Sequence, residues 1–430
     1  MDKFSFHNSF RISLQHFVAS DPQLSALAQF KYVAPLDWWK KINPNSAGLY
    51  ILSGGRQVGK STSLKLFMRH LLEQNQAPPG NIFYFPCDQI MDRDELYQII
   101  TNFRQQINPS KSFYLFIDEI TMVEDWEKTI KGFADEGLFR QGICILTGSD
   151  RIMLDQAASA LPGRRGPSNE VDFLLMPISF REFCNLVHSH SSPISGQGLL
   201  TLFNSYLACG GVLPAINNLL MSGAIQPSTY QTYQNWIVGD FLKRGKRKEF
   251  LKEVLRVILT TLGSQITYND LARKCAHINT DTFIDYLHLL ERMDVLLVLG
   301  AFDQNTQSAF PKKAKKIIFK DPFILSALQK WVSPSKEIID ESILVENLCI
   351  AHFARQYPVF YIKAEGEVDL VYLEKNNFWP VEIKWTKKLR PKDIKQIKKY
   401  ENSVILGKQF EEILWENIPV KSLIKCLYNI

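Results

Sequence analysis

A glycine-bracketed loop between an apolar run and a helical run carries the clearest chemical pattern in the sequence. Gly54 is followed by four residues and then by Gly59, Lys60 and Ser61. Glycines let backbone N–H groups face phosphate oxygens, and the start of the next helix adds a positive dipole end. The lysine charge suits the β- and γ-phosphates, and the serine hydroxyl suits Mg²⁺. The spacing therefore predicts a P-loop that binds ATP and Mg²⁺.

Two acidic residues end a second apolar run, which reads FYLFIDEI at positions 113–120. We expect Asp118 to hold Mg²⁺ through water and Glu119 to polarise the attacking water. A buried strand that ends at a helix cap would show the same letters. The P-loop upstream favours the catalytic interpretation, so the two motifs together indicate ATP hydrolysis.

Two later segments add candidate groups for the same site. The strand ICILTGS ends in Thr147 and Ser149, either of which could sense the γ-phosphate through its hydroxyl. The loop LPGRRG carries Arg164 and Arg165, and an arginine there could stabilise transition-state charge in its own subunit or in a neighbour. A solvated surface loop is the alternative for the arginines, and an oligomer stays open. The full set of predicted nucleotide contacts is Gly54, Gly55, Arg56, Gln57, Val58, Gly59, Lys60, Ser61, Thr62 and Thr147.

These motifs need a parallel sheet to bring them together. Apolar β runs alternate with helical segments, which is typical of parallel strands flanked by helices, and nucleotides bind at the carboxyl ends of such strands. The expected strands are 49–53, 82–86, 113–118, 143–147 and 173–176. Residues 1–47 read as helices, in which Trp38 and Trp39 either pack in the core or lie beside the adenine.

A second group of chemical residues lies near the C-terminus. Glu346, Asp369 and Glu382 could hold Mg²⁺ or Mn²⁺, and Lys384 could orient an attacking water, as phosphodiester cleavage requires. Glu382 and Lys384 share one face of a strand because they are two positions apart. Asp369 is expected to end the preceding β run, and Glu346 to lie on a helix before it. The alternative is an amphipathic strand with a solvated charged face.

Basic residues surround that group. Positions 383–399 hold eight Lys or Arg residues against one Asp, which predicts a DNA-binding face. The tract PKKAKK at 311–316 predicts a basic hairpin that neutralises phosphates. Residues 251–303 read as three helices and a β run, the pattern of a winged helix. Acidic residues on the third helix favour a protein or domain contact over DNA.

Length and composition limit the class of protein. A chain of 430 residues is expected to form two or three domains. The seven cysteines are scattered and show no C-x-x-C spacing, which argues against disulfides and zinc and favours the cytoplasm. The sequence has no apolar stretch long enough to span a membrane, so no membrane partner is expected.

Several segments together resemble a known family. GGRQVGKS, FIDEI, LTGS, LPGRRG and MPISFREF are similar to the AAA-type ATPases of archaea and bacteria that carry a C-terminal domain of unknown function, number 4143. This resemblance implies an AAA-like core, a helical segment, a winged helix and a restriction-endonuclease-like domain. The C-terminal acidic group is similar to the PD-(D/E)xK nucleases, and Gln396 and Tyr400 resemble a helix motif of their DNA-repair branch.

The predicted fold is α/β, with an AAA-like P-loop domain, a helical and winged-helix middle, and an α/β restriction-endonuclease-like C-terminal domain. The predicted domains are 1–47, 48–184, 185–310 and 311–430. The predicted function is a Mg²⁺-dependent ATPase coupled to a nuclease-like, DNA-binding domain. The alternative is an ATP-dependent regulatory switch that binds a protein partner and whose nuclease-like domain is catalytically inert. Nuclease activity is left open.

Overall fold

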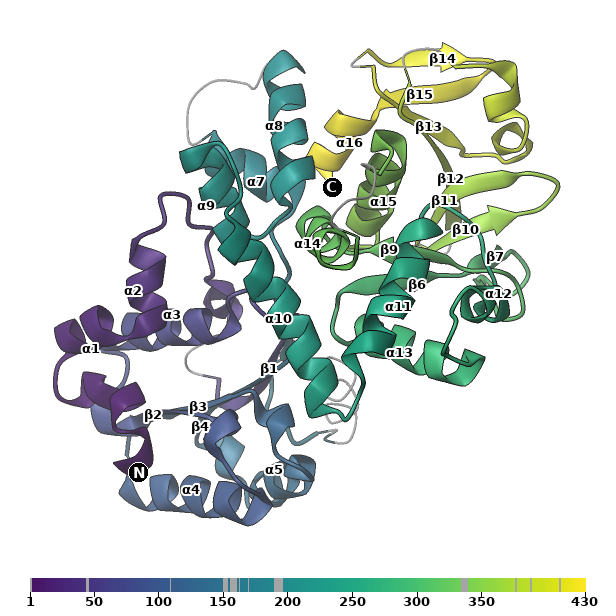
Figure 1. Cartoon of the computed structure of the whole chain (residues 1–430). Helices are drawn as coiled ribbons and strands as arrows, with labels where there is room; N and C mark the ends of the chain where they lie inside the picture. Colours follow the sequence, from purple (N-terminus) through teal and green to yellow (C-terminus); the bar gives the residue numbers. More distant parts are fainter. Residues whose placement is uncertain are drawn as a thin grey trace. The chain divides into compact units, whose positions relative to one another are not determined.

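The computed structural model (Figure 1) divides into two compact units, Met1–Met176 and Pro177–Ile430. It describes residues 2–43, 46–108, 110–149, 154, 161, 163–168, 170–188, 196–333, 339–375, 377–386, 389–409 and 411–430. Within these ranges no helix is long and apolar enough to cross a membrane.

A five-stranded parallel sheet forms the centre of the first unit, as the alternating β runs predicted. The strands are β1 Gly48–Ser53, β2 Ile82–Pro86, β3 Phe113–Asp118, β4 Gly142–Gly148 and β5 Asp172–Leu174. Their order is β2-β3-β4-β1-β5. Because β4 lies between β1 and β3, the strands that lead into the P-loop and into Asp118 end on either side of Thr147.

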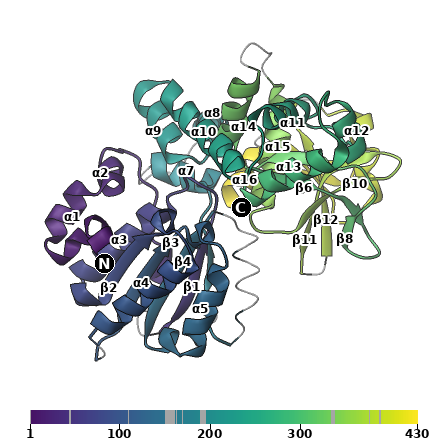
Figure 2. The same cartoon turned by 60° about the horizontal axis from the view of Figure 1, so that its bottom comes forward.

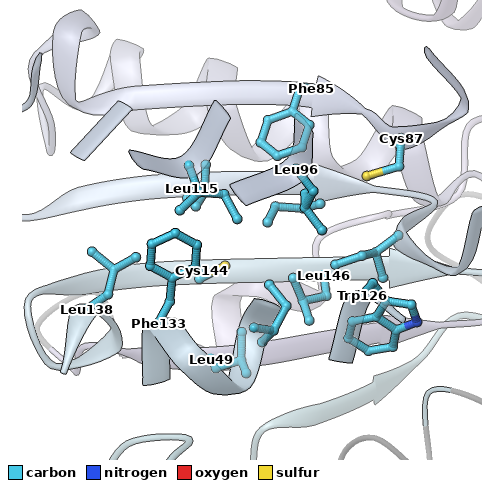
Figure 3. Packing of buried hydrophobic residues seen from close by; sticks show 14 of the residues in the cluster. Leu49, Phe85, Cys87, Leu96, Leu115, Trp126, Phe133, Leu138, Cys144 and Leu146 are labelled. Atoms are coloured by element: carbon cyan, nitrogen blue, oxygen red, sulfur yellow. The ribbon is translucent and has the colours of Figure 1, made fainter. Parts of the chain in front are cut away.

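Side chains of this sheet alternate between two buried layers, since successive strand residues point to opposite faces. One layer packs against α4 (Arg93–Gln106) and α5 (Trp126–Asp135). Figure 3 shows this layer, in which Leu115 of β3 and Trp126 of α5 belong to one buried cluster. The opposite layer packs against α3 (Lys60–Glu73) and the N-terminal helices, which Figure 2 shows from a second direction. Both faces of the sheet are therefore covered.

The N-terminal segment covers the edge strand β2. The Asn8 side chain donates to the Tyr84 carbonyl at 2.8 Å and accepts from the Tyr84 N–H at 2.9 Å, as a neighbouring strand would. Trp39 stacks on Phe67 of α3 with 5.4 Å between ring centroids, and Trp38 packs against the same cluster. Of the two interpretations of Trp38 and Trp39, packing in the core or a place beside the adenine, the structure supports core packing. The helices of this segment are η1 Asp2–Phe4, η2 Phe6–Arg11, α1 Leu14–Ser20, α2 Pro22–Ala28 and η3 Trp38–Lys41. Four further short helices of the unit are η4 Pro79–Asn81, η5 Cys87–Gln89, η6 Ile120–Met122 and η7 Leu138–Arg140.

The second unit begins with a helical segment, which confirms the predicted helical middle. Its helices are α7 Phe180–Val187, α8 Gly196–Cys209, α9 Leu213–Ser222, α10 Pro227–Lys243, α11 Lys248–Thr260, α12 Tyr268–Arg273, α13 Thr280–Arg292 and α14 Pro322–Val332. Thr267 caps α12 by accepting from the Asp270 N–H at 3.1 Å.

The second unit also contains an eight-stranded mixed sheet, in the order β14-β15-β13-β12-β11-β10-β7-β8. β10, β11 and β12 are antiparallel neighbours, whereas β13 runs parallel to β12. The helix α15 packs on β11 and β12, and α16 packs on β13 and β15. The strands are β7 Ala301–Asp303, β8 Ser308–Phe310, β10 Val359–Lys363, β11 Glu367–Glu374, β12 Asn377–Lys384, β13 Val404–Gly407, β14 Ile413–Trp415 and β15 Ile418–Ser422. The helices are α15 Glu341–Phe353, η8 Pro391–Ile394, η9 Ile397–Lys399 and α16 Leu423–Asn429.

A long hairpin connects the helical segment to this sheet. β6 (Leu296–Leu299) pairs antiparallel with β9 (Lys316–Phe319), and β7 pairs with β8 between them. The same hairpin joins the large sheet where Ala301 lies beside Tyr361 of β10. Strands before residue 310 therefore contribute to the C-terminal sheet.

Two local expectations near the C-terminus were wrong. Asp369 is the third residue of β11 and does not end that strand, because the apolar run continues through Tyr372. The expected helix around Gln396 consists of the short 3-10 helices η8 and η9. Proline at 391, which fixes its own φ and lacks an N–H donor, suits only the first turn of a helix.

Candidate nucleotide site and C-terminal carboxylate cluster

The loop between β1 and α3 has the backbone that a P-loop requires. Gly54 has a φ of 149°, and a Cβ at this position would lie 2.2 Å from the Leu175 carbonyl oxygen. Gly59 has a φ of 97° and forms the N-cap of α3. Having no side chain, Gly59 leaves the first-turn N–H groups of α3 to another acceptor. A phosphate is the acceptor that this geometry favours.

Lys60 is turned into this loop and is only 4% exposed. Its Nζ donates to the Gly54 and Gly55 carbonyl oxygens, each at 2.9 Å, and lies 3.5 Å from Glu119 Oε1. The ammonium group is therefore held mainly by neutral acceptors. Phosphate oxygens bind an ammonium group more strongly than carbonyl oxygens do, so a nucleotide could take over these contacts.

Asp118 is held by two hydroxyl groups from neighbouring strands. Thr147 of β4 donates to Asp118 Oδ1 and also accepts from the Glu119 N–H at 2.9 Å. Tyr84 of β2 donates to Asp118 Oδ2 at 2.6 Å, a contact that the sequence did not suggest. Burial and the Asp118 charge raise the pKa of Tyr84 far above its usual range, so this phenol remains a donor. The three strands together fix the carboxylate orientation.

Glu119 bridges the P-loop and β4. Its backbone is left-handed, with φ 54° and ψ 45°, which turns the side chain from the direction of β3 toward Lys60. Oε2 accepts from the Ser149 N–H at 3.2 Å. Burial alone would raise the pKa of Glu119, but the charges of Lys60 and Arg56 lower it below its ordinary value. The carboxylate is therefore ionised, as a group that orients water must be.

The remaining predicted contacts lie on the same loop and helix turn. Ser61 and Thr62 are half-buried in the first turn of α3. Arg56, Gln57 and Val58 form the loop before it, and Gln57 is left-handed with a φ of 62°. Their nucleotide contacts stay predictions.

The two arginines of the loop 161–166 have different surroundings. Pro162 of the same loop lies outside the described residues. Arg165 is buried, and its guanidinium donates to both carboxylate oxygens of Asp172, at 2.8 and 2.6 Å, and to the Val171 carbonyl at 2.9 Å. These bonds attach the loop to β5. Arg164 is more exposed and pairs with Asp135. A transition-state role stays a prediction for both, and Arg164 has the more exchangeable partner.

The second unit brings the predicted acidic residues together. Lys384 Nζ lies 2.5 Å from Glu382 Oε1 and 3.6 Å from Asp369 Oδ2 on the neighbouring strand. Asp369 Oδ2 also accepts from the Ile383 N–H at 2.9 Å. Glu346, on α15, is connected to these residues by a lysine that the sequence analysis did not assign to the site.

That residue is Lys316 of β9, which is 1% exposed. Its Nζ lies 2.7 Å from Glu346 Oε1 and 3.8 Å from Asp369 Oδ1, and it also contacts Glu367. Burial alone would lower the pKa of Lys316, but the three neighbouring carboxylates raise it above its ordinary value. We call these four residues, together with Glu382 and Lys384, the carboxylate cluster.

The prediction that the lysines of residues 311–316 neutralise phosphates is therefore wrong for two of them. Lys316 is buried among carboxylates, and Lys315 is buried with its Nζ donating to the Phe310 and Pro311 carbonyls, each at 3.2 Å. Both lie at the start of a strand that packs inward, so neither reaches a phosphate at the surface. Burial lowers the pKa of Lys315.

The carboxylate cluster does not fit a divalent metal in the arrangement that the structure describes. No set of three or more His, Cys, Asp or Glu side chains within the described ranges is placed to hold a metal ion. Lys316 lies where the carboxylates of Glu346 and Asp369 converge. Burial and the Asp369 charge raise the pKa of both Glu346 and Glu382. Burial is the first cause of both shifts, and the charges of Lys316 and Lys384 offset only part of it.

The side chains of Gln396 and Tyr400, the two residues of the predicted helix motif, also contact each other. Gln396 Nε2 donates to the Tyr400 hydroxyl at 3.0 Å, and Gln396 Oε1 accepts from the Gly366 N–H at 3.2 Å. Gln396 thus attaches η9 to the turn before β11.

Three family models match parts of the sequence. Residues 46–184 match an AAA domain, residues 200–335 match a domain of unknown function (DUF8612), and residues 341–428 match a domain of unknown function (DUF4143).

Two uncharacterized proteins are similar over most of the chain. A protein of Haemophilus influenzae is 23% identical over 396 residues, which cover 86% of this chain and 92% of that protein. Protein MJ1544 of Methanocaldococcus jannaschii is 26% identical over 381 residues, which cover 85% of this chain and 80% of that protein.

Among solved structures, the Walker-type ATPase PABY2304 of Pyrococcus abyssi is 16% identical, with a TM-score of 0.43 over 65% of this chain and 91% of that one. The ORC2 protein of Aeropyrum pernix is 11% identical, with a TM-score of 0.38 over 67% of this chain and 88% of that one. Residues 46–184 thus match an AAA domain and have an AAA-like P-loop fold, which supports an ATPase.

Proposed function

We propose that this protein is a Mg²⁺-dependent ATPase whose nucleotide state controls a nuclease-like C-terminal domain that binds DNA. One observation carries the first part: Lys60, Glu119 and the Asp118–Thr147 pair meet at the carboxyl end of the parallel sheet. That edge is where α/β sheets bind nucleotides.

In this proposal ATP displaces the carbonyl contacts of Lys60, and the ammonium group then binds the β- and γ-phosphates. Ser61 and Asp118 would hold Mg²⁺, which neutralises charge on those phosphates. Glu119 orients the attacking water and accepts its proton. Thr147 bonds to both the Asp118 carboxylate and the Glu119 N–H, which holds the two acidic residues in one arrangement.

The proposed domains are 1–47, 48–184, 185–310 and 311–430. The proposed winged helix is supported by α11, α12 and α13, which precede the antiparallel pair β6–β9, and by the bridge between Ile266 and Lys315. Asp285 of α13 pairs with Lys246 at 2.6 Å within this proposed domain. The nuclease-like assignment is supported by α15, the meander β10–β12 and the parallel strand β13.

DNA binding is supported by exposed lysines beside the carboxylate cluster. Lys395, Lys398 and Lys399 are exposed on η9 and the residues before it. Lys398 pairs with Glu416 at 3.4 Å and Lys399 pairs with Glu365 at 2.5 Å, both near the surface. Exposed ion pairs are weak, so phosphates could replace these carboxylates.

The alternative function is an ATP-driven switch that binds a protein partner and has an inert nuclease-like domain. The presence of Lys316 inside the carboxylate cluster favours inertness, since it leaves no metal site in this arrangement. DNA affinity that falls steeply with salt supports the DNA-binding proposal. Salt-independent or absent DNA affinity, with partner binding lost in Lys60→Ala, supports the switch.

The experiment for the ATPase mechanism is the variant Glu119→Gln, which keeps the side-chain shape and removes the charge. We expect ATP to bind but to turn over about a hundredfold more slowly, measured as phosphate release beside fluorescent-nucleotide binding. Glu124→Gln, at an exposed neighbouring carboxylate, is the matched control and should behave as wild type. Normal turnover in Glu119→Gln would remove Glu119 from the mechanism.

A further inference from the structure

We propose that Lys316 is an internal cation of the carboxylate cluster, which occupies the place of a divalent ion and keeps the cluster metal-free. The proposal deepens the proposed function by assigning how this site is regulated, and it rests on that function for the nuclease-like character of the domain. It implies that the C-terminal domain binds its target without metal-dependent cleavage.

The contacts of Lys316 are those of a bound cation. Its Nζ lies 2.7 Å from Glu346 Oε1 and 3.8 Å from Asp369 Oδ1, and it contacts a third carboxylate at Glu367. These carboxylates come from α15 and from β11, two separate elements that meet only in the folded unit. Carboxylate oxygens are also the ligands of Mg²⁺ and Mn²⁺. An ammonium group and a metal ion cannot occupy the same point.

The charges of the cluster explain why the lysine remains there. Four carboxylates face two ammonium groups, those of Lys316 and Lys384. One carboxylate oxygen, Glu382 Oε2, is buried without a hydrogen-bond partner among the described residues. Removal of Lys316 would leave one more buried carboxylate without a compensating charge, which is unfavourable unless another cation or a proton binds there.

Two hydrogen bonds from the Asn347 side chain to the backbone of β9 hold Lys316 in position. Asn347, which follows Glu346 on α15, accepts from the Phe319 N–H at 2.8 Å and donates to the Phe319 carbonyl at 2.7 Å. This pair of bonds sets the register of β9 against α15. Because this register is set, Lys316 at the start of β9 lies next to Glu346. Lys316 belongs to the hairpin that follows the helical segment.

The test is Mn²⁺ binding to the nucleotide-free full chain, measured by calorimetry, for wild type and for Lys316→Met. Met keeps the length of the side chain and removes its charge. We expect Mn²⁺ to bind Lys316→Met at least about tenfold more tightly than wild type, and to raise its Tm, because a divalent ion replaces the lost charge. Adding Asp369→Asn to this variant should remove the gain, which localises the ion.

Lys313→Met is the matched control, because it removes one charge from the same hairpin at an exposed position. Its Mn²⁺ affinity should equal that of wild type. If Lys316→Met does not fold, Lys316→Gln tests the same idea, since it removes the same charge but keeps a polar end that can bond to the carboxylates. We expect a smaller gain there, of about threefold, because the amide still occupies part of the place of the ion. Unchanged affinity in the folded variant, or tight Mn²⁺ binding by wild type, would overturn the proposal.

ATP turnover and DNA binding are measured on the same preparations, so the two proposals can fail separately. A gain in Mn²⁺ affinity with neither ATP turnover nor DNA binding would contradict the proposed function but would support the role of Lys316 as the internal cation of the cluster. Normal ATP turnover and DNA binding without the gain would contradict only the assignment of Lys316.

Discussion

The two units each bury a lysine among oxygen atoms, but the oxygens differ in charge. Lys60 is held by two neutral carbonyls of its own loop and lies 3.5 Å from one carboxylate. Lys316 lies within 4 Å of three carboxylates from other elements. Carbonyl contacts are readily exchanged for phosphate, whereas the contacts of a buried ion cluster are costly to break. The first lysine is therefore available for a ligand, and the second is part of the fold.

The largest expected effect is on catalysis at the exchangeable lysine. Lys60→Ala should lower ATP turnover by about a thousandfold, because it removes the buried ammonium group that is expected to bind the β- and γ-phosphates. Phosphate release and nucleotide binding are the measurements. Arg69→Ala, on an exposed face of the same helix, should retain wild-type turnover. If Lys60→Ala hydrolyses ATP normally, Lys60 is not the lysine that binds the nucleotide, and the comparison with Lys316 is contradicted.

The comparison also predicts losses of stability that differ in size. Lys316→Ala should lower the unfolding free energy by about 3 kcal/mol, because it leaves buried carboxylates without their partner. Lys60→Ala should cost about 1 kcal/mol, the value of ordinary hydrogen bonds to carbonyls. Urea denaturation followed by tryptophan fluorescence would measure both. Equal losses for the two variants would show that the charge of the partners does not decide the difference.

A buried histidine adds acid sensitivity to the second unit. His352 Nε2 accepts from the Phe180 N–H at 3.0 Å, so Nδ1 carries the proton and donates to the Leu348 carbonyl at 3.1 Å. Burial and the Arg355 charge lower the pKa of His352 to about 3. The unfolded chain takes up this proton near pH 6.5, so stability present above that pH is lost as pH falls toward 3.

The loss attributable to His352 should be about 1.4 kcal/mol per pH unit between pH 6 and 4. His352→Gln cannot titrate and should show a correspondingly shallower pH dependence in urea denaturation. His277→Gln, at an exposed histidine, should keep the wild-type slope. A His352→Gln slope as steep as that of wild type would place the acid sensitivity elsewhere.

The smallest effect for each residue is expected at the surface lysines. Changing Lys395, Lys398 and Lys399 to Glu should weaken DNA binding and reduce its salt slope by about one for each lost phosphate contact. Fluorescence anisotropy at several salt concentrations would measure this change. A matched reversal of Lys111, Lys128 and Lys131 on the first unit should leave the slope unchanged. The same slope in both triple variants would move the DNA-binding face.

Much of the nucleotide site was predictable because its residues are close in sequence or follow apolar strands. The spacing from Gly54 to Ser61 defines a loop, and five apolar runs predicted the strands that order it. Tyr84 was missed because a tyrosine in an apolar strand resembles any core residue. Only the pairing of β2 with β3 brings its hydroxyl to Asp118.

The sequence by itself determined the local chemistry: the glycines of the P-loop, the acidic end of β3 and the spacing of Glu382 and Lys384 on one strand. Only the tertiary structure decided which long-range partners those groups receive. Lys316 lies in a tract of four lysines and reads as a surface charge. It is buried because β9 pairs with β6 and is clamped to α15 by Asn347. Charge can be read from a sequence, whereas burial and partners depend on which elements pack together.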